Sequence, residues 1–326
     1  MGARHRCQRQ AGQRSGVGPA PVSRQGKRQP ARRCDGRVRR DAGAQHQGGD
    51  RRRAALAAGR RHPCYAGRRR ADHLSDHEDR ARAGRRQQGR RRTQRNTAYD
   101  NAYYSDTCKC MFIGDGSFFT SLGAIDVIGH EMAHGVTAAT SNLIYSGESG
   151  GLNESSSDIT GDVVESYARA GGTGASVPNT GNDWQTGKEI SRTGTPLRWM
   201  YKPSKDGGSP NAWSSSIKRL DVHYSSGPNN RMFYFLAKGS SATVGSDTYS
   251  AFLTKAPLAM TGIGTDKAFR IWFKALTTKF TSSTNYADAR LKVLAAAQEL
   301  YGVGSVEEKA VTRAYAAINV GLDIAE

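Results

Sequence analysis

Hydrophobic residues are distributed unevenly along this 326-residue chain, and every Phe, Trp and Ile lies after residue 96. In the range 123–140, the apolar residues that share one helical stripe are Ile125, Ile128, Met132 and Val136. A second such stripe contains Ile159, Val163, Val164 and Tyr167. This periodicity predicts one helix over 123–140 and another over about 152–168.

The C-terminal part repeats the helical periodicity and predicts a small all-helical domain. Its helices are expected near residues 228–239, 265–280, 284–301 and 305–319. Thr265 with Asp266 is an N-cap signal for the second of these. Ser305 with Glu308 is a capping box for the last.

Turn signals separate these elements. Gly302 and Gly304 should break the chain between the last two helices, and Gly321 should end the last one. The segment 172–226 is rich in Gly, Pro, Ser and Thr, so we expect it to be mostly loop. A short strand is expected before the turn Gly114-Asp115-Gly116, which makes the fold class α+β.

The positive charge of the chain is concentrated at its N-terminus. Residues 1–96 contain 28 of the 48 Lys and Arg but only 7 of the 29 Asp and Glu, so the rest of the chain is nearly neutral. This segment cannot build a core, and we expect it to be disordered. One hypothesis is a polybasic tail for nucleic acid or an anionic surface. The other is GC-rich coding sequence translated in the wrong frame, which the Arg, Gly and Ala mixture favours.

Composition also bounds the class of protein. No apolar run approaches the roughly 18 residues of a membrane span, and no signal peptide is visible, so a membrane protein is not expected. Five cysteines, including Cys108 and Cys110, are too few and too unevenly placed for a disulfide framework. The redox state of Cys108 and Cys110 stays open.

The clearest chemical motif is an HExxH sequence, His130-Glu131-Met132-Ala133-His134, inside the first predicted helix. Residues four apart lie about 40° apart around a helix and one turn apart along it. Both imidazoles can therefore reach one metal ion while Glu131 is turned to the side. This arrangement suits Zn²⁺ with a carboxylate near its open position.

A catalytic zinc ion requires a third protein ligand, and Glu154 at the start of the second helix supplies it. Asp158, one turn further, can accept the free N–H of a ligand imidazole and fix its orientation. The one other histidine after residue 96, His223, can donate a hydrogen bond to an oxyanion, with Asp221 orienting its ring. The alternatives are a solvated acidic face and a structural histidine.

These motifs together resemble the thermolysin family of secreted zinc metalloendopeptidases, over about residues 96–321. The resemblance rests on HExxH, on the segment 151–158 and on Asp221-Val222-His223-Tyr224-Ser225-Ser226-Gly227. It implies a two-lobed catalytic unit with a mainly β N-terminal lobe, a central HExxH helix and a helical C-terminal lobe. Because the Arg-rich stretch stands where most of the β lobe would be, we expect that lobe to be truncated.

The resemblance also implies roles for single residues. It makes Glu131 the general base and gives Tyr145 and His223 hydrogen bonds to the transition state. Residues expected to bind the substrate are Asn101 and Ala102 on its backbone, Arg198 on a carbonyl, and Val127 and Leu197 around a bulky hydrophobic side chain after the scissile bond. Structural Ca²⁺ would be bound by Asp126, Asp162, Glu165, Asp183 and the carbonyl of Gln185.

We therefore expect a zinc metalloendopeptidase, secreted and monomeric, that acts on proteins or peptides. Its expected organisation is an Arg-rich segment 1–96, a remnant N-terminal lobe with the zinc helices 97–170, a loop-rich connection 171–226 and a helical domain 227–326. An exopeptidase is an alternative within the enzyme class. The alternative outside it is an impaired fragment whose basic tail binds nucleic acid or anionic surfaces.

Overall fold

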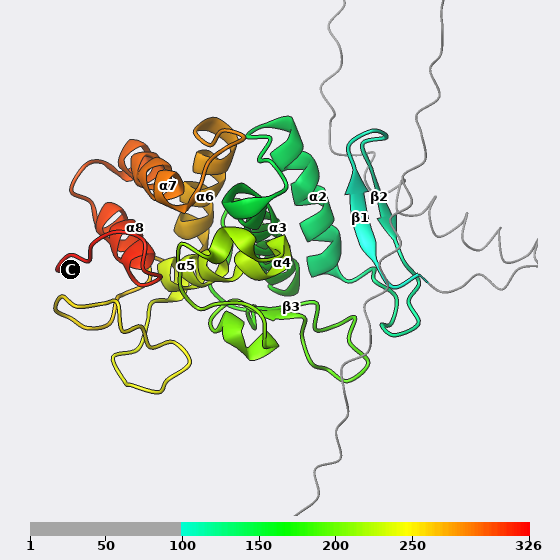
Figure 1. The fold of residues 1–326 in the computed structure, drawn as a ribbon, viewed down its shortest axis with the longest axis horizontal. Helices are drawn as coiled ribbons and strands as arrows, with labels where there is room; N and C mark the ends of the chain where they lie inside the picture. Colours follow the sequence, from blue (N-terminus) through cyan, green and yellow to red (C-terminus); the bar gives the residue numbers. More distant parts are fainter. Residues whose placement is uncertain (1–98) are drawn as a thin grey trace, which may run out of the picture. The chain divides into compact units, whose positions relative to one another are not determined.

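A β-hairpin begins the part of the chain that the computed structural model describes, residues 99–326 (Figure 1). Its strands β1 (Ala102–Ser105) and β2 (Cys110–Ile113) are antiparallel. Tyr103 stacks on Phe112 across the ladder, with ring centroids 4.7 Å apart. The sequence predicts a single short strand before the glycine-rich turn, and the structure adds its partner.

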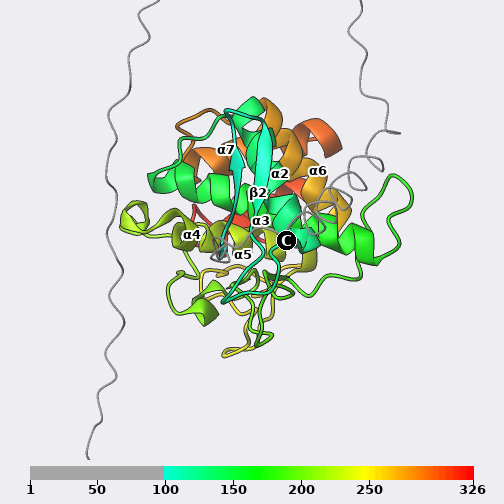
Figure 2. The ribbon, with the colours of Figure 1, turned by 90° about the vertical axis from the view of Figure 1, so that its right-hand side faces the viewer.

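The hairpin packs against α2 (Ile125–Ala139), and it lies in front of this helix in the turned view (Figure 2). Tyr104 covers Gly135 so closely that a Cβ there would lie 2.9 Å from the tyrosine ring. At the tip of the hairpin, Cys108 and Cys110 form a disulfide, which settles the redox state that the sequence leaves open.

Glycine allows α2 to cross α3 (Gly147–Arg169) at short range. A Cβ on Gly161 would lie 2.4 Å from the carbonyl oxygen of Asp126, and one on Gly129 would lie 3.0 Å from the Gly161 Cα. Both predicted helices are present. The second begins at Gly147, several residues earlier than its apolar pattern indicates, because its first turns carry polar and glycine residues.

The segment between α3 and the C-terminal helices is mostly loop, as predicted. Its regular elements are β3 (Gln185–Thr186), β4 (Arg198–Trp199), the 3-10 helices η2 (Pro203–Asp206) and η3 (Ile217–Arg219), and the short helix α4 (Val222–Ser225). Trp184, Met200 and Ile217 are buried against the helices, so this loop-rich segment is part of the core.

Four helices form the C-terminal part, close to the predicted ranges (Figure 1). They are α5 (Gly227–Lys238), α6 (Thr265–Thr278), α7 (Tyr286–Tyr301) and α8 (Val306–Ala316). Their largest fully buried side chains include Phe233, Phe235, Trp272, Tyr286 and Tyr315. The hairpin, the central helices and this helical part together confirm the predicted α+β class.

Helix ends agree with the sequence signals in part. Ser305 caps α8, and its Oγ accepts the N–H of Glu308 at 3.2 Å. Thr265 is not a cap, because it is the first residue of α6 and a glycine with a φ of 87° occupies the cap position. The last helix ends at Ala316 rather than near Gly321.

The Arg-rich segment 1–96 lies outside the described residues. Within residues 99–326, the helices lack the combination of length and apolar character that crossing a bilayer requires. The domain boundaries given above stay predictions.

Candidate metal centre

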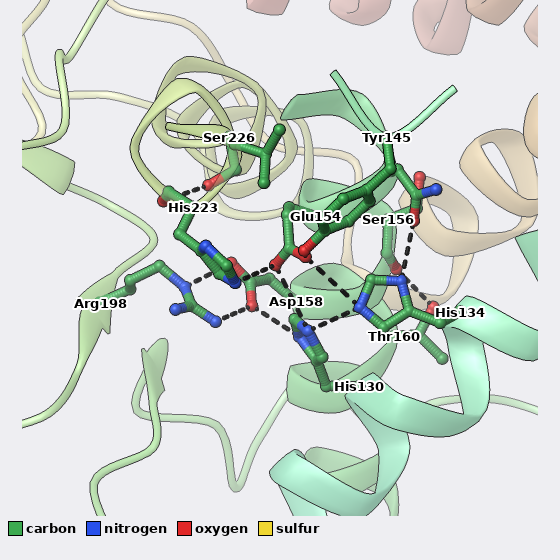
Figure 3. Close-up of polar contacts among 12 residues, drawn as sticks. His130, His134, Tyr145, Glu154, Ser156, Asp158, Thr160, Arg198, His223 and Ser226 are labelled. Atoms are coloured by element: carbon green, nitrogen blue, oxygen red, sulfur yellow. Dashed lines mark hydrogen bonds and ion pairs between the residues drawn. The ribbon is translucent and has the colours of Figure 1, made fainter. Parts of the chain in front are cut away.

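Two histidines of α2 and one glutamate of α3 meet where the helices cross (Figure 3). The Nε2 atoms of His130 and His134 lie 3.1 Å apart. Each of these nitrogens lies 3.4 Å from a carboxylate oxygen of Glu154. Among residues 99–326, this is the one group of His, Cys, Asp or Glu residues in which three ligand atoms lie within 4.8 Å of one another. The structure thus brings together the three predicted ligands.

Each imidazole is oriented by a partner on α3. His130 Nδ1 lies 2.9 Å from Asp158 Oδ1, and His134 Nδ1 lies 2.8 Å from Asn153 Oδ1. With each Nδ1 held by its partner on α3, Nε2 is the nitrogen of each imidazole that remains available to a metal ion. Asp158 has the predicted position. The sequence did not lead us to assign a role to Asn153, although its amide side chain directly precedes Glu154 in the chain.

Two of the three ligands, Glu154 and His134, have the protonation states that a divalent cation needs. Burial lowers the pKa of His130, but its hydrogen bonds with Asp158 and Glu154 raise it to about 10, so a cation must displace a proton from this imidazole. Burial raises the pKa of Glu154, but hydrogen bonding and charge from His130 lower it to about 2, so the carboxylate is ionised at neutral pH. Burial and the neighbouring His130 lower the pKa of His134 to about 4, so this imidazole is neutral. The Oε2 atom of Glu154 is buried, and Nε2 of His130 and Nε2 of His223 lie 3.4 Å and 3.6 Å from it. Two imidazoles and a carboxylate beside an open cavity fit Zn²⁺.

Glu131 lies on the wall of the same cavity and is 6% exposed. Burial raises its pKa, and the charge of His130 offsets part of this rise. A carboxylate with a raised pKa holds a proton more readily than an ordinary one, as a general base must.

Two further predicted groups face Glu154 from other elements (Figure 3). The Tyr145 hydroxyl donates to Glu154 Oε1. His223 on α4 has its Nε2 3.6 Å from Glu154 Oε2, and its Nδ1 lies 2.8 Å from Asp221 Oδ1. Asp221 also accepts the backbone N–H of His223 at 3.0 Å, so it caps the helix and orients the ring. Tyr145 and His223 both line the cavity, so each presents a polar group to it.

A pair of glycines on α3 lets α4 approach this closely. A Cβ on Gly150 would lie 2.5 Å from Cγ1 of Val222, and one on Gly151 would lie 2.5 Å from Oγ of Ser225. Any larger residue at either position would push α4 away. The glycines that precede the glutamate in the sequence therefore control the distance of His223 from the metal ligands.

The residues predicted to bind substrate line two adjoining hollows. Asn101 and Ala102 border both, and Val127 and Leu197 line the second, a cavity of about 160 Å³ with Leu122 and Ile190 in its wall. The N–H of Gly114 donates to the Asn101 carbonyl at 3.0 Å and holds this edge beside the hairpin. His130 and Glu131 line the second hollow together with these apolar side chains.

Arg198 also borders the second hollow, but its strongest contacts are with Asp158. Its Nε donates to Asp158 Oδ2 at 2.7 Å and its Nη2 donates to Asp158 Oδ1 at 2.6 Å. Burial raises the pKa of Asp158, but Arg198 and His130 hold it well below its usual range. Arg198 therefore keeps ionised the carboxylate that orients His130.

The predicted calcium ligands surround the other end of the helix crossing. Asp162 is fully buried, and neither of its carboxylate oxygens has a donor among the described residues. Burial, together with the charges of nearby carboxylates, raises its pKa well above the ordinary value. Burial and the charge of Asp126 raise the pKa of Glu165 to about 7.

Three of the predicted calcium ligands have partners within the protein, and one of them is Glu165, whose Oε1 accepts from Arg169 Nη2 at 2.7 Å. Asp126 Oδ2 accepts the N–H of Gly187 at 2.6 Å, and Asp183 Oδ2 lies 2.8 Å from Lys188 Nζ. Gln185 follows in β3, and its N–H donates to Asp183 Oδ1 at 3.2 Å. The unpaired oxygens of Asp162 and Glu165 still fit an oxygen-ligated cation such as Ca²⁺.

Two family models match the chain: "Thermolysin metallopeptidase, catalytic domain" over residues 65–138 and "Thermolysin metallopeptidase, alpha-helical domain" over residues 141–320. The first match begins upstream of the described residues.

Individual proteins are similar over the same region. A transglutaminase-activating metalloprotease of Streptomyces mobaraensis is 49% identical over 226 residues, which is 68% of this chain and 29% of that protein. Bacillolysin of Bacillus cereus is 39% identical over 230 residues, which is 68% of this chain and 36% of that protein. The solved precursor of protealysin, a metalloproteinase from Serratia proteamaculans, superposes with a TM-score of 0.54 at 26% identity, covering 68% of this chain and 66% of that one. This chain thus spans about a third of the length of these two curated relatives.

Proposed function

Because the chain belongs to the thermolysin metallopeptidase family, we propose that it is a zinc metalloendopeptidase that hydrolyses internal peptide bonds of proteins. The observation that carries the proposal is the convergence of His130, His134 and Glu154. The two Nε2 atoms lie 3.1 Å apart, and each lies 3.4 Å from a carboxylate oxygen of Glu154. These three residues would hold Zn²⁺.

When bound, Zn²⁺ supplies Lewis-acid polarisation of the scissile carbonyl and of the attacking water. Glu131 takes a proton from that water, because its raised pKa and its place beside the ligands suit a base. It then passes the proton to the leaving amine. His223 Nε2 and the Tyr145 hydroxyl donate hydrogen bonds to the carbonyl oxygen as it gains negative charge, and Asp221 holds His223 for this.

The second hollow suits a bulky hydrophobic side chain of the substrate. Val127 and Leu197 form part of its wall, next to His130 and Glu131. A substrate side chain in this pocket would place the bond to be cut beside the metal, with Asn101 and Ala102 pairing with the substrate backbone. Arg198 reaches the same hollow and would bind a substrate carbonyl with the donors that Asp158 leaves free.

The acidic cluster is the proposed site of structural Ca²⁺. Asp126, Asp162, Glu165 and Asp183, with the carbonyl of Gln185, offer oxygen ligands only, which is the preference of Ca²⁺. The support is electrostatic: buried carboxylate oxygens without donors among the described residues need a counter-charge. A bound cation would supply it.

A secreted location is also proposed. The disulfide between Cys108 and Cys110 supports it, because such bonds persist mainly in oxidising compartments. The expected partners are protein and peptide substrates.

The test is hydrolysis of a hydrophobic peptide blocked at both ends, with and without a zinc chelator. Wild-type cleavage that the chelator stops would support the proposal, and an exopeptidase would leave this substrate intact. Glu131→Gln should lower kcat by at least about a hundredfold while zinc stoichiometry is retained, because a positioned base contributes about 10²–10⁴ in rate. Glu189→Gln, an exposed carboxylate on the same protein, is the matched control. Full activity of Glu131→Gln would contradict the mechanism.

A further inference from the structure

Asp158 accepts four hydrogen bonds, and one of them comes from a helix outside the metal centre. Its Oδ1 faces His130 Nδ1 and Arg198 Nη2, and its Oδ2 faces Arg198 Nε. The fourth donor is Nδ2 of Asn230 on α5, which lies 2.8 Å from Asp158 Oδ2. We propose that Asn230 is a positioning residue that fixes the rotation of the Asp158 carboxylate and so directs His130 Nε2 at the metal. This inference rests on the proposed function, because that function assigns zinc to His130.

The burial of Asn230 indicates that the hydrogen bond donated by its amide group is the reason for an asparagine at this position. The residue is 1% exposed, and its Oδ1 has no donor among the described residues. A buried polar atom without a partner destabilises the folded protein, and an apolar side chain of the same shape would avoid this cost. The orientation of the amide also follows from chemistry, because exchanging its oxygen and nitrogen would place an oxygen against the Asp158 carboxylate.

Asn230 supplies a constraint that Arg198 does not. Arg198 is held on β4 in the loop-rich segment, whereas Asn230 belongs to a buried helix of the C-terminal core. This helix directly follows α4, which carries His223. The same run of chain therefore places the proposed oxyanion donor beside Glu154 and holds the carboxylate that orients His130.

The preceding residue provides a matched control. Asn229 is fully buried on the same helix, and its Nδ2 donates to Ser155 Oγ at 2.8 Å instead of to Asp158. Replacing either asparagine with leucine removes one buried hydrogen bond and keeps a similar side-chain shape. The two variants differ in whether the lost bond ends on the carboxylate that contacts His130 or on the hydroxyl of Ser155, which has no hydrogen bond to an imidazole of the described residues.

The experiment measures the zinc affinity of the full chain by competition with a chromogenic chelator, and thermal unfolding of the metal-free protein. Asn230→Leu and Asn230→Ala should both weaken zinc binding about tenfold, the lower range for groups that orient metal ligands. Asn229→Leu should lower the unfolding temperature to a similar extent but leave zinc affinity unchanged. If Asn230 acted through packing alone, Asn230→Leu would keep the zinc affinity that Asn230→Ala loses.

Wild-type zinc affinity in Asn230→Leu would overturn the inference, and so would an equal loss of affinity in Asn229→Leu. Should the leucine variant fail to fold, Asn230→Ala compared with Asn229→Ala gives the same decision, because alanine introduces no added bulk. The zinc measurement uses no substrate. A wild-type chain that binds zinc but cleaves no peptide would therefore contradict the proposed function and leave the role of Asn230 standing.

Discussion

Two clusters of buried polar groups lie where α2 and α3 cross, and they differ in whether these groups have hydrogen-bond partners within the protein. The acidic cluster lies one helical turn from the metal centre on each helix, since Asp126 precedes His130 by four residues and Asp162 follows Asp158 by four. In the metal centre, His130 and His134 each have a partner at 2.9 Å or less. In the acidic cluster, Asp162 has none among the described residues.

The difference follows from the chemistry of the ligands. A neutral imidazole has a second nitrogen that can be anchored while the first faces the metal, so the zinc site is preorganised by the protein. Carboxylates that face one another repel, and burial strengthens this repulsion. We therefore expect the metal centre to contribute activity with little effect on folding, and the acidic cluster to contribute stability that depends on a bound cation.

The largest expected effect lies in the metal centre. Glu154→Gln should lower peptidase activity by more than about a hundredfold, the upper range for groups that merely orient ligands, because it removes a ligand itself. The metal-free fold should persist, since the residue keeps its size and the imidazoles keep their own partners. Activity assays with zinc analysis and thermal unfolding in EDTA would measure both. Loss of folding in this variant would contradict the expectation that the metal centre has little effect on folding.

The acidic cluster should make the metal-free protein sensitive to pH. The pKa of Glu165 is raised to about 7 from 4.5, so the folded state binds the proton more tightly than the unfolded state. The contribution of Glu165 to stability in EDTA is therefore greatest below pH 4.5, and it is lost as the pH rises through about 7. The loss from Glu165 is on the order of 3 kcal/mol. Denaturant unfolding across this range would measure it, and Ca²⁺ should restore stability near neutral pH. A stability that rises over this range would contradict the explanation.

Substitution at the helix crossing should disturb both clusters together. Gly161→Ala places a Cβ 2.4 Å from the Asp126 carbonyl oxygen, so the helices must separate. Overpacking of this kind costs about 1–3 kcal/mol. Zinc affinity and calcium response should fall in the same variant. Gly123→Ala, where the nearest atom would be 3.5 Å away, is the control, and equal effects in the two variants would show that contact at the crossing is unimportant.

The smallest effect should have the opposite sign. Asp162→Asn replaces a buried carboxyl group that burial and the neighbouring carboxylates make costly to ionise, so it should raise the stability of the metal-free protein at neutral pH. The same change should weaken the stabilising response to Ca²⁺. Unfolding in EDTA and in Ca²⁺ would separate these effects. A variant that is less stable in EDTA would show that the carboxylate has a favourable partner.

The apolar stripe of α2 shows where sequence patterns reach their limit. The stripe predicts the helix correctly, yet Ile125 is 42% exposed and Met132 is 53% exposed. The buried face carries His130 and Glu131 instead, because α3 and the metal-site cavity lie on that side. Periodicity locates a helix, but the burial of a polar face depends on partners that another segment provides.

The sequence by itself predicted the long helices, the α+β class and the three residues that we propose as zinc ligands, because helical spacing and ligand chemistry are local properties. It did not reveal the partner strand β1, the absence of a cap role for Thr265, or the contacts of Asn153 and Asn230. These depended on tertiary structure. An amide becomes an orienting group only when folding places it against a particular histidine or carboxylate, and Gly161 matters only because another helix crosses there. Such long-range contacts leave no spacing in the chain from which they can be predicted.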